Sequence, residues 1–502
     1  MTETSKRSGG AGSIARGATI IAIGALASKI IGAAYRIPLT NIIGAEGIGL
    51  YQMVFPVYCA LLTFSSSGLP AAISKLIANG EEKGYLRKSL LLFGGLGLLG
   101  SALMCVLEGF LAKLQGNPKA TLCYAALSPS VFAVSIISCF RGYFQGRNNM
   151  SPTALSQIIE QVVKTGFGII VCARFSYSAE LAAAAASLAV TVSEFFALLY
   201  LFARFYFTRG KVARSEGGAR YGEILRLTFP ATLVAVALPL GHLADSFIVI
   251  NALGEAERAT ALFGVYSGSV AAIIGVPVAL AYGAAVASVP FVSRGESDKI
   301  VDSMRFTALI AIPFSIFFVL FAEESFNLLY GGMGAAERFT GARILALDSL
   351  SVVTLSFLQT TNALLLALGK QRISVISMGA GLTIRAALCL LLCRFSGIGV
   401  LGAVIAANIS YVFSLSLNLR FCLKRSLVPH VLKDAAAYLI FAFLCVSAAR
   451  AVYFAAPTVA VFLISSSLSA AAYLALAYLF GALQGREIRV FPGLSGTLKT
   501  KN

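Results

Sequence analysis

Histidine and charged side chains are scarce in this chain of 502 residues. It contains two histidines, and Asp, Glu, Lys and Arg together make up 12% of it. A catalytic triad therefore has few side chains that could act as its base. The sequence contains neither a nucleotide-binding P-loop nor an HExxH metal motif. These absences predict that the protein is not an enzyme.

Paired cysteines are missing as well. Nine cysteines lie in or beside apolar runs, and none of them forms a CxxC motif. This pattern predicts buried, inert thiols and argues against a zinc site or a disulfide framework. Gly95, Gly97 and Gly100 spell GxGxxG inside an apolar segment, where close helix packing explains them better than nucleotide binding does. We expect no bound metal and no cofactor.

Hydrophobic residues dominate what is present, at 58% of the chain with a mean hydropathy of +0.84. No soluble domain has this composition, so we predict an all-α polytopic membrane protein. A spanning helix needs about 20 mostly apolar residues. By that measure we identify about fourteen transmembrane helices. They cover 17–38, 47–79, 89–112, 121–145, 152–173, 181–207, 226–250, 260–291, 306–330, 340–367, 374–393, 399–422, 434–452 and 458–481.

Most of the Lys and Arg residues behind the net charge of +18 lie in the segments between these helices. With the N-terminus inside, the inner segments carry 22 of the 40 Lys and Arg residues and the outer segments carry eight. This asymmetry predicts a multi-pass protein with both termini in the cytoplasm. The cations therefore need no nucleic-acid partner to explain them.

A weak internal repeat divides the chain. Residues 146–151 resemble 369–374 at a shift of 223, and Ala185-Ala186-Ser187 recurs as Ala406-Ala407-Asn408 at a shift of 221. We interpret this as two pseudo-symmetric six-helix lobes followed by two C-terminal helices, with a substrate path between the lobes. The predicted parts are a cytoplasmic tail (1–16), an N-lobe (17–207), a cytoplasmic linker (208–225), a C-lobe (226–422), two further helices (434–481) and a cytoplasmic tail (482–502).

Several cations lie within the apolar segments. Lys29 and Arg36 are seven residues apart, which is two helical turns, so both are predicted to project from one face. A cation at membrane depth costs at least a few kcal/mol unless it faces protein, water or a counter-ion. Snorkelling or a buried ion pair is the structural alternative for each. The candidate anion-binding residues are Lys29, Arg36, Lys75, Arg141, Lys164 and Arg385.

Polar residues and helix breakers complete the candidate site. Glu160 and Lys164 are four residues apart in the favourable order for an ion pair, and His242 and Asp245 could share a proton. Among the acids, Asp245 is our choice for coupling to protons or sodium. The candidate cavity or coupling residues are Glu160, Gln161, Glu194, His242, Asp245, Asp348 and Asn408. The candidate hinge residues are Gly68, Pro70, Pro277 and Gly283.

The runs 28–40, 43–53 and 68–75 resemble the stage V sporulation protein B-like, polysaccharide-export branch of the multidrug/oligosaccharidyl-lipid/polysaccharide (MOP) flippases. That branch includes lipid II flippases of peptidoglycan synthesis. The resemblance implies a bacterial plasma-membrane flippase that moves an undecaprenyl-pyrophosphate-linked saccharide to the outer leaflet by alternating access. It also implies that 434–481 form a groove for the lipid tail. The lipid II flippases usually carry an arginine where this chain has Lys29, which cannot make a bidentate phosphate contact.

Two other functions are compatible with the sequence. One is a cation-coupled multidrug exporter of the same superfamily, although such a pocket should be rich in acids. The other is a non-transporting scaffold in envelope assembly. The expected partners of a flippase are its lipid-linked substrate, membrane lipids and cell-wall synthesis proteins. The sequence leaves open whether the saccharide belongs to peptidoglycan, spore cortex or capsule, and whether membrane potential, protons or sodium drive transport.

Overall fold

The computed structural model describes residues 4–66, 68–78, 82–208, 221–296, 298–395, 397–422 and 428–479. The secondary structure of these residues is helical throughout, without a β-strand. Twelve of the helical stretches are long and apolar enough to cross a membrane. The predicted class, an all-helical polytopic membrane protein, is therefore confirmed. The helices fall into two compact units, Met1–Gly268 and Ser269–Asn502.

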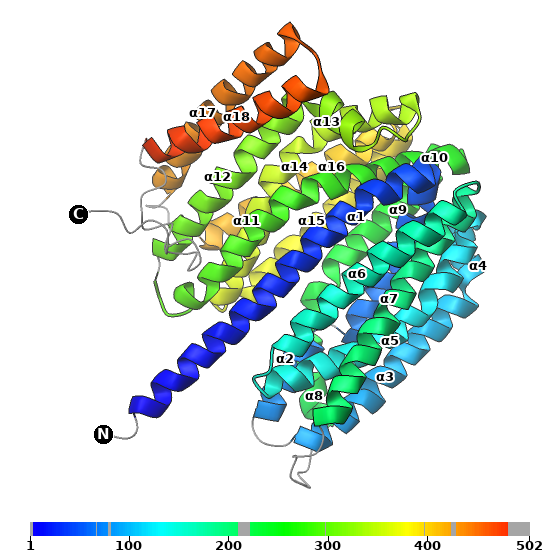
Figure 1. The fold of residues 1–502 in the computed structure, drawn as a ribbon, viewed down its shortest axis with the longest axis vertical. Coiled ribbons are helices and arrows are strands. Elements are labelled where there is room, and N and C mark those ends of the chain that lie inside the picture. The colour runs from blue at the N-terminus through cyan, green and yellow to red at the C-terminus, as the bar shows by residue number, and fades with distance from the viewer. Residues whose placement is uncertain are drawn as a thin grey trace. The chain divides into compact units, whose positions relative to one another are not determined.

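The first unit contains eleven α-helical or 3-10 elements, drawn in blue to green in Figure 1. Helices α3, α5 and α7 pack in a row, and α6 packs against both α1 and α7. The bounds are α1 (Thr4–Ser66), α2 (Leu69–Ala78), α3 (Glu82–Val106), α4 (Glu108–Leu114), η1 (Pro118–Ala120), α5 (Thr121–Gly146), α6 (Ser151–Arg174), α7 (Ala179–Thr208), α8 (Tyr221–Ala235), α9 (Ala237–Leu253) and α10 (Ala256–Phe263). A π-helix, η3 (Gly264–Val270), follows α10.

The second unit is built around α14, which packs against α11, α12, α13 and α16. A hairpin of α17 and α18 lies on α12 (Figure 1), where α17 packs along it and Tyr473 of α18 donates to the carbonyl oxygen of Leu309 at 2.9 Å. Arg305 of α12 forms an ion pair with Asp434 of α17, and Glu324 of α13 forms one with Arg450 of α17. The bounds are α11 (Ala271–Val292), α12 (Asp298–Leu320), α13 (Ala322–Leu329), α14 (Ala335–Ala367), α15 (Gln371–Phe395), α16 (Val400–Cys422), α17 (Val428–Ala455) and α18 (Val459–Leu479).

The structure differs from the sequence prediction in how the first two spans are joined. The predicted spans 17–38 and 47–79 fall on two helices that meet at a kink without a loop between them, and the apolar stretch Ile30–Ile77 runs across this kink. Gly44 bends this stretch with φ 72° and ψ −179°, a conformation that glycine adopts without a steric penalty. The predicted span 226–250 is divided at Val236 into α8 and α9. These two features account for twelve long apolar stretches where the sequence predicts about fourteen spans.

The predicted hinges fall at different kinds of backbone. Gly68 has φ 70° and lies between the end of α1 at Ser66 and the start of α2 at Leu69, so the helix is interrupted there. Helix α11 instead continues through Pro277 and Gly283. The irregular backbone near that region is η3, which precedes α11. Hinge motion at any of these positions stays a prediction.

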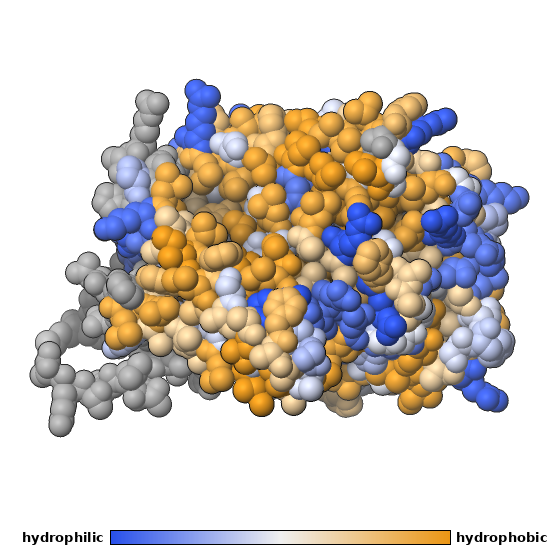
Figure 2. Space-filling view, turned by 90° about the horizontal axis from the view of Figure 1, so that it is seen from above, coloured by the Kyte–Doolittle hydropathy of each residue, from blue (hydrophilic) through white to orange (hydrophobic). Residues whose placement is uncertain are grey.

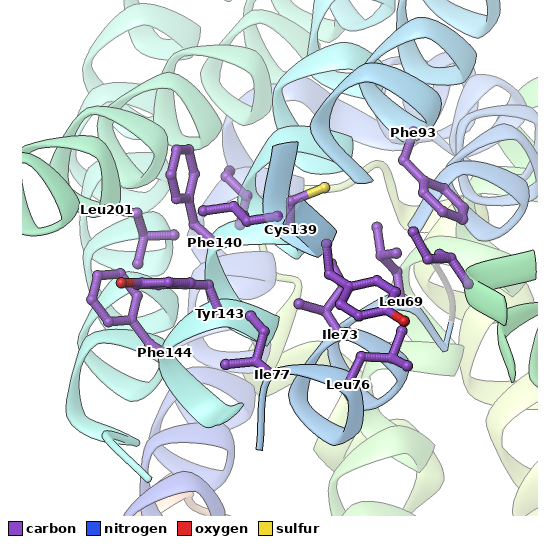
Figure 3. Close-up of a cluster of buried hydrophobic side chains, with 14 of the residues drawn as sticks. Leu69, Ile73, Leu76, Ile77, Phe93, Cys139, Phe140, Tyr143, Phe144 and Leu201 are labelled. Atoms are coloured by element: carbon purple, nitrogen blue, oxygen red, sulfur yellow. The ribbon is translucent and has the colours of Figure 1, made fainter. Parts of the chain in front are cut away.

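Apolar packing fixes the helices around the break at Gly68. Leu69, Ile73 and Ile77 of α2 face Phe140 and Phe144 of α5 in a buried cluster (Figure 3). Two glycines of α5, at 142 and 146, permit this approach, because a Cβ on either would lie 2.8 Å from Cβ of an α2 isoleucine. Outside such clusters, large apolar side chains are widely exposed, and they cover much of the face shown in Figure 2. This distribution is expected of a protein surrounded by hydrocarbon.

The second half of α1 lies against α10 and η3 at nearly backbone-to-backbone distance. A Cβ added to Gly49 would lie 2.0 Å from the carbonyl oxygen of Thr260, and one added to Gly264 would lie 2.4 Å from that of Ala45. Small residues permit this type of close helix crossing in membranes. The approach brings polar backbone atoms of α10 and η3 within reach of side chains on α1.

We predict that Gly49→Ala destabilises the protein by at least about 2 kcal/mol, because its methyl group would collide with backbone atoms that cannot rotate away. The melting temperature of the purified protein in detergent measures the effect. Gly95→Ala is the matched control, since nothing lies within 4 Å of its added Cβ. Equal melting temperatures for the two variants would show that α1 and α10 are not packed as described.

Candidate functional site

A network of charged side chains lies inside the first unit, where α1, α5, α6 and α7 pack together. Arg141 of α5 places Nη2 3.2 Å from Oε2 of Glu160 on α6, and its Nε donates to Oγ of Ser156 at 3.0 Å. Gln161 donates from Nε2 to the other carboxylate oxygen of Glu160 at 3.1 Å. Both oxygens of Glu160 are therefore engaged. The predicted i,i+4 pairing of Glu160 with Lys164 is replaced by a contact with another helix.

Glu194 of α7 is the most deeply buried acid of this network, at 5% exposure. Its Oε2 is buried and has no hydrogen-bond partner among the described residues. The charged groups that act on it are Glu160, Arg141 and Lys164. Tyr58 of α1 interacts electrostatically with both Glu160 and Glu194. The structure thus brings together three of the predicted cavity residues, Glu160, Gln161 and Glu194.

Lys164 is half-buried on the face of α6 that carries this network. It interacts electrostatically with Glu160 and Glu194, and with Arg36 of α1. Gln157, Glu160, Gln161 and Lys164 follow a spacing of three, four and seven residues, so they lie along one face of α6. The buried Oε1 atoms of Gln157 and Gln161 lack hydrogen-bond partners in the part of the chain that the structure describes. This face therefore offers unused polar atoms as well as charge.

Arg36 reaches η3 from the face of α1 where the backbones approach each other. Its Nη1 donates to the carbonyl oxygen of Gly268 at 3.3 Å, and Gln52 Nε2 donates to that of Ser267 at 2.5 Å. π-helical turns in α-helices frequently mark functional sites. The side chain of Lys29 lies outside what the structure describes, so its predicted position beside Arg36 stays a prediction. Lys75 is exposed on α2.

In the second unit, the predicted polar residues form hydrogen bonds with one another. Asn408 of α16 donates from Nδ2 to Oδ1 of Asp348 on α14 at 3.3 Å, and Ser351 also donates to this carboxylate. Arg385 of α15 is 3% exposed, donates to the hydroxyl of Tyr411 at 3.0 Å and lies over its ring. These contacts join α14, α15 and α16 through polar side chains at membrane depth.

Lys164 is matched with Arg385 if the predicted internal repeat has a shift of 221 residues at this point, as it has between Ser187 and Asn408. The repeat then predicts one cation at the same point of each half. His242 and Asp245 on α9 differ in environment, since His242 is exposed and Asp245 is 2% exposed. A proton shared between these two residues stays a prediction.

A second charged cluster, which sequence patterns do not predict, lies elsewhere in the first unit, and we call it the Lys119 cluster (Lys119, Glu46, Glu257, Asn117 and Thr260). Lys119 Nζ lies 3.0 Å from Oε1 of Glu46 on α1 and 2.7 Å from Oε1 of Glu257 on α10. Asn117 donates to Thr260 Oγ1 at 2.9 Å. The cluster ties α10 to the segment before α5 and to α1. Each charge lies near the end of a predicted span, and pairing between such distant segments leaves no signal in one sequence.

Comparison with known proteins places this architecture in a family. A family model described as "Polysaccharide biosynthesis protein" matches residues 14–296. Stage V sporulation protein B of Bacillus subtilis (strain 168) is 27% identical over 420 residues, covering 78% of this chain and 80% of that protein. Lipid II flippase MurJ of the same organism is 24% identical over 441 residues, covering 80% of each.

Solved structures agree on the fold. A lipid II flippase MurJ in an inward closed conformation has a TM-score of 0.74 at 14% identity, covering 92% of this chain and 99% of that one. An inward-facing multidrug resistance MATE family transporter has a TM-score of 0.67 at 17% identity, covering 81% and 96%. The family resemblance expected from residues 28–75 is thereby confirmed. The chain belongs to the polysaccharide biosynthesis protein family, a family of multi-pass membrane transporters in the MOP superfamily and not of enzymes.

Proposed function

We propose that this transporter moves an undecaprenyl-pyrophosphate-linked saccharide from the inner to the outer leaflet of a bacterial plasma membrane. The observation that carries the proposal is the pairing pattern of the cations at membrane depth. Arg141 is neutralised by Glu160, whereas neither Arg36 nor Lys164 has a carboxylate in ion-pair contact among the described residues. Two half-buried cations are thus left for an anion.

The chemistry of the cargo fits this arrangement. A pyrophosphate carries about two negative charges and cannot enter hydrocarbon unless they are compensated, since burying an unpaired charge costs several kcal/mol or more. Arg36 and Lys164 can each offer a charge-assisted hydrogen bond to its oxygens. Arg385 is the proposed contribution of the second half of the chain. An inside-negative potential favours the movement by about 2.3 kcal/mol per 100 mV for each net negative charge that moves outward.

The relatives support this class of cargo without naming the saccharide. One is a sporulation protein and another a lipid II flippase, so peptidoglycan precursor, spore-cortex precursor and other polysaccharide units are all candidates. We place the chain in cell-wall or polysaccharide biogenesis on this basis. Cell-wall synthesis proteins are the partners we expect.

The topology we propose has fourteen spanning helices with both termini in the cytoplasm. It counts the two parts of α1 on either side of Gly44 as separate spans and α8 with α9 as one kinked span. Spans one to six form an N-lobe (17–207), spans seven to twelve a C-lobe (226–422), and α17 and α18 provide a groove for the lipid tail. The lobes would rock about the cations and expose them to each leaflet in turn.

We propose that the Lys119 cluster must open during that cycle. In the proposed topology Lys119, Glu46 and Glu257 lie at the outer ends of their spans. Their ion pairs and the glycine contacts of Gly49 close this end of the first unit. A cargo that leaves on the outer side requires α10 to move away from α1. The pair with Glu257 is exposed and suits such a contact, because an exposed pair contributes at most about 1 kcal/mol and breaks readily.

A multidrug exporter remains the alternative function, since the fold is shared with a MATE family transporter. The network of α1, α5, α6 and α7 argues against cationic drugs as cargo. It contains three cations, Arg36, Arg141 and Lys164, and two acids. Membership of a transporter family argues against the scaffold function.

We predict that Arg36→Ala and Lys29→Ala each lower the flipping rate about tenfold or more, which corresponds to one lost charge-assisted hydrogen bond. Arg36→Lys should retain part of the rate. Flipping of a labelled lipid-linked saccharide in proteoliposomes is the measurement, and Arg174→Ala, exposed at the end of α6, is the control. Wild-type rates for both alanine variants would exclude these cations from cargo transport.

We also predict that Lys119→Ala raises several-fold the population in which α10 is separated from the start of α5, because the ion pairs of Lys119 with Glu46 and Glu257 are lost. Distances between spin labels at positions 122 and 258, both exposed, report the opening, in a variant whose exposed Cys105 is serine. Lys113→Ala in the neighbouring helix α4 is the control. An unchanged distance distribution for Lys119→Ala would show that the cluster does not hold this end closed.

A further inference from the structure

Glu194 and Glu108 are the two acids of the first unit with a buried carboxylate oxygen that lacks a hydrogen-bond partner among the described residues, and Glu194 is the more deeply buried of them. The residue is 5% exposed, and Oε2 is buried without a hydrogen-bond partner in the described part of the chain. A buried carboxylate that lacks hydrogen bonds is costly in its ionised form. Binding a single proton removes that cost and also gives the oxygen a hydrogen to donate.

The groups that face Glu194 come from each of the helices packed around α7. Arg141 of α5 is committed to Glu160 and Ser156. Glu160 and Lys164 of α6 act on Glu194 with opposite signs, and Tyr58 of α1 lies within electrostatic range. Lys119, beside η1, is not among the charged groups that act on Glu194, and it is engaged by Glu46 and Glu257. Glu160 therefore opposes a charge on Glu194, while Lys164 supports it.

These surroundings favour a proton over a metal cation. A metal ion needs several oxygen ligands, and Arg141 and Lys164 would repel it. The described residues contain no group of three or more His, Cys, Asp or Glu side chains that could hold a metal. A proton needs only one free oxygen, which Glu194 Oε2 provides.

Protonation changes the charge that the network offers to an anion. Arg36, Arg141 and Lys164 contribute three positive charges, and Glu160 and ionised Glu194 contribute two negative ones. The network therefore carries a net charge of +1 when Glu194 is ionised and +2 when it is protonated. The second value matches the two charges of a pyrophosphate, and it releases Lys164 from attraction to Glu194.

We propose that Glu194 is a proton-binding site coupled to the cargo, taking a proton from water when an anionic lipid pyrophosphate binds and returning it when the lipid leaves. This inference rests on the proposed function. Linkage makes the coupling reciprocal, so the affinity for the cargo rises as the pH falls. One proton for each cargo limits the gain to tenfold per pH unit.

Isothermal titration calorimetry of the full chain in detergent tests the proposal, with undecaprenyl pyrophosphate as the probe. Titrations at one pH in two buffers with different ionisation enthalpies give the number of protons taken up. We expect the wild type to take up about one proton more than Glu194→Gln, whose affinity should lose most of its pH dependence. Glu180→Gln, on the first turn of the same helix, is the control and should behave as the wild type does.

The outcomes separate the two proposals. Binding of the probe with equal proton uptake by the wild type and Glu194→Gln would overturn the coupling and leave the cargo assignment intact. Failure of the wild type to bind the probe at any pH would overturn the cargo assignment itself. If Glu194→Gln does not fold, infrared difference spectra of the wild type replace it, because cargo binding should then produce the carbonyl band of a newly protonated carboxyl group. Absence of that band would overturn the coupling.

Discussion

The cost of removing charge from water governs the interior of this protein. Each charged side chain at membrane depth must contact an opposite charge, a polar group or an aqueous ligand, because hydrocarbon offers none of these. The described residues show several solutions. Arg141 uses the carboxylate of Glu160, Arg385 uses the hydroxyl and ring of Tyr411, and Arg36 uses a carbonyl oxygen of η3. The first contact pairs opposite charges, and the other two set a guanidinium against neutral polar or aromatic groups.

Close helix packing makes these solutions available. Gly32 lies where a Cβ would come 3.0 Å from Oε1 of Gln161, and Gly168 lies where one would come 2.3 Å from the hydroxyl of Tyr35. Glycines in α1 and α6 thus leave room for polar groups between helices that are otherwise apolar. The same property brings Arg36 to Gly268 through the approach of α1 to η3. The polar contacts between these helices therefore depend on glycines at the points where the helices approach each other.

Composition and periodicity were sufficient for the class of the fold, because spanning helices need long apolar runs that few soluble proteins contain. Composition and periodicity were insufficient to predict how consecutive helices are connected. Gly44 is a one-residue kink between two helical parts of α1, and nothing in the sequence separates such a kink from a loop. The partner of Glu160 shows the same limit. Lys164 is near in sequence, but Arg141, nineteen positions away on α5, forms the ion pair. Tertiary packing selects among partners that helical spacing alone ranks incorrectly.

The predicted internal repeat indicates which charged positions the two halves of the chain share. Lys164 and Arg385 recur at the shift of 221, whereas the positions equivalent to Glu160 and Glu194 are Gly381 and Leu415. The predicted repeat therefore has a cation at this point in both halves and these two acids in the first half alone. Arg385 is enclosed by Tyr411 and is 3% exposed, but Lys164 is half-buried and is balanced against two carboxylates. If Glu194 takes up the proton that we propose, the charge beside Lys164 changes while the contacts of Arg385 with Tyr411 stay as they are.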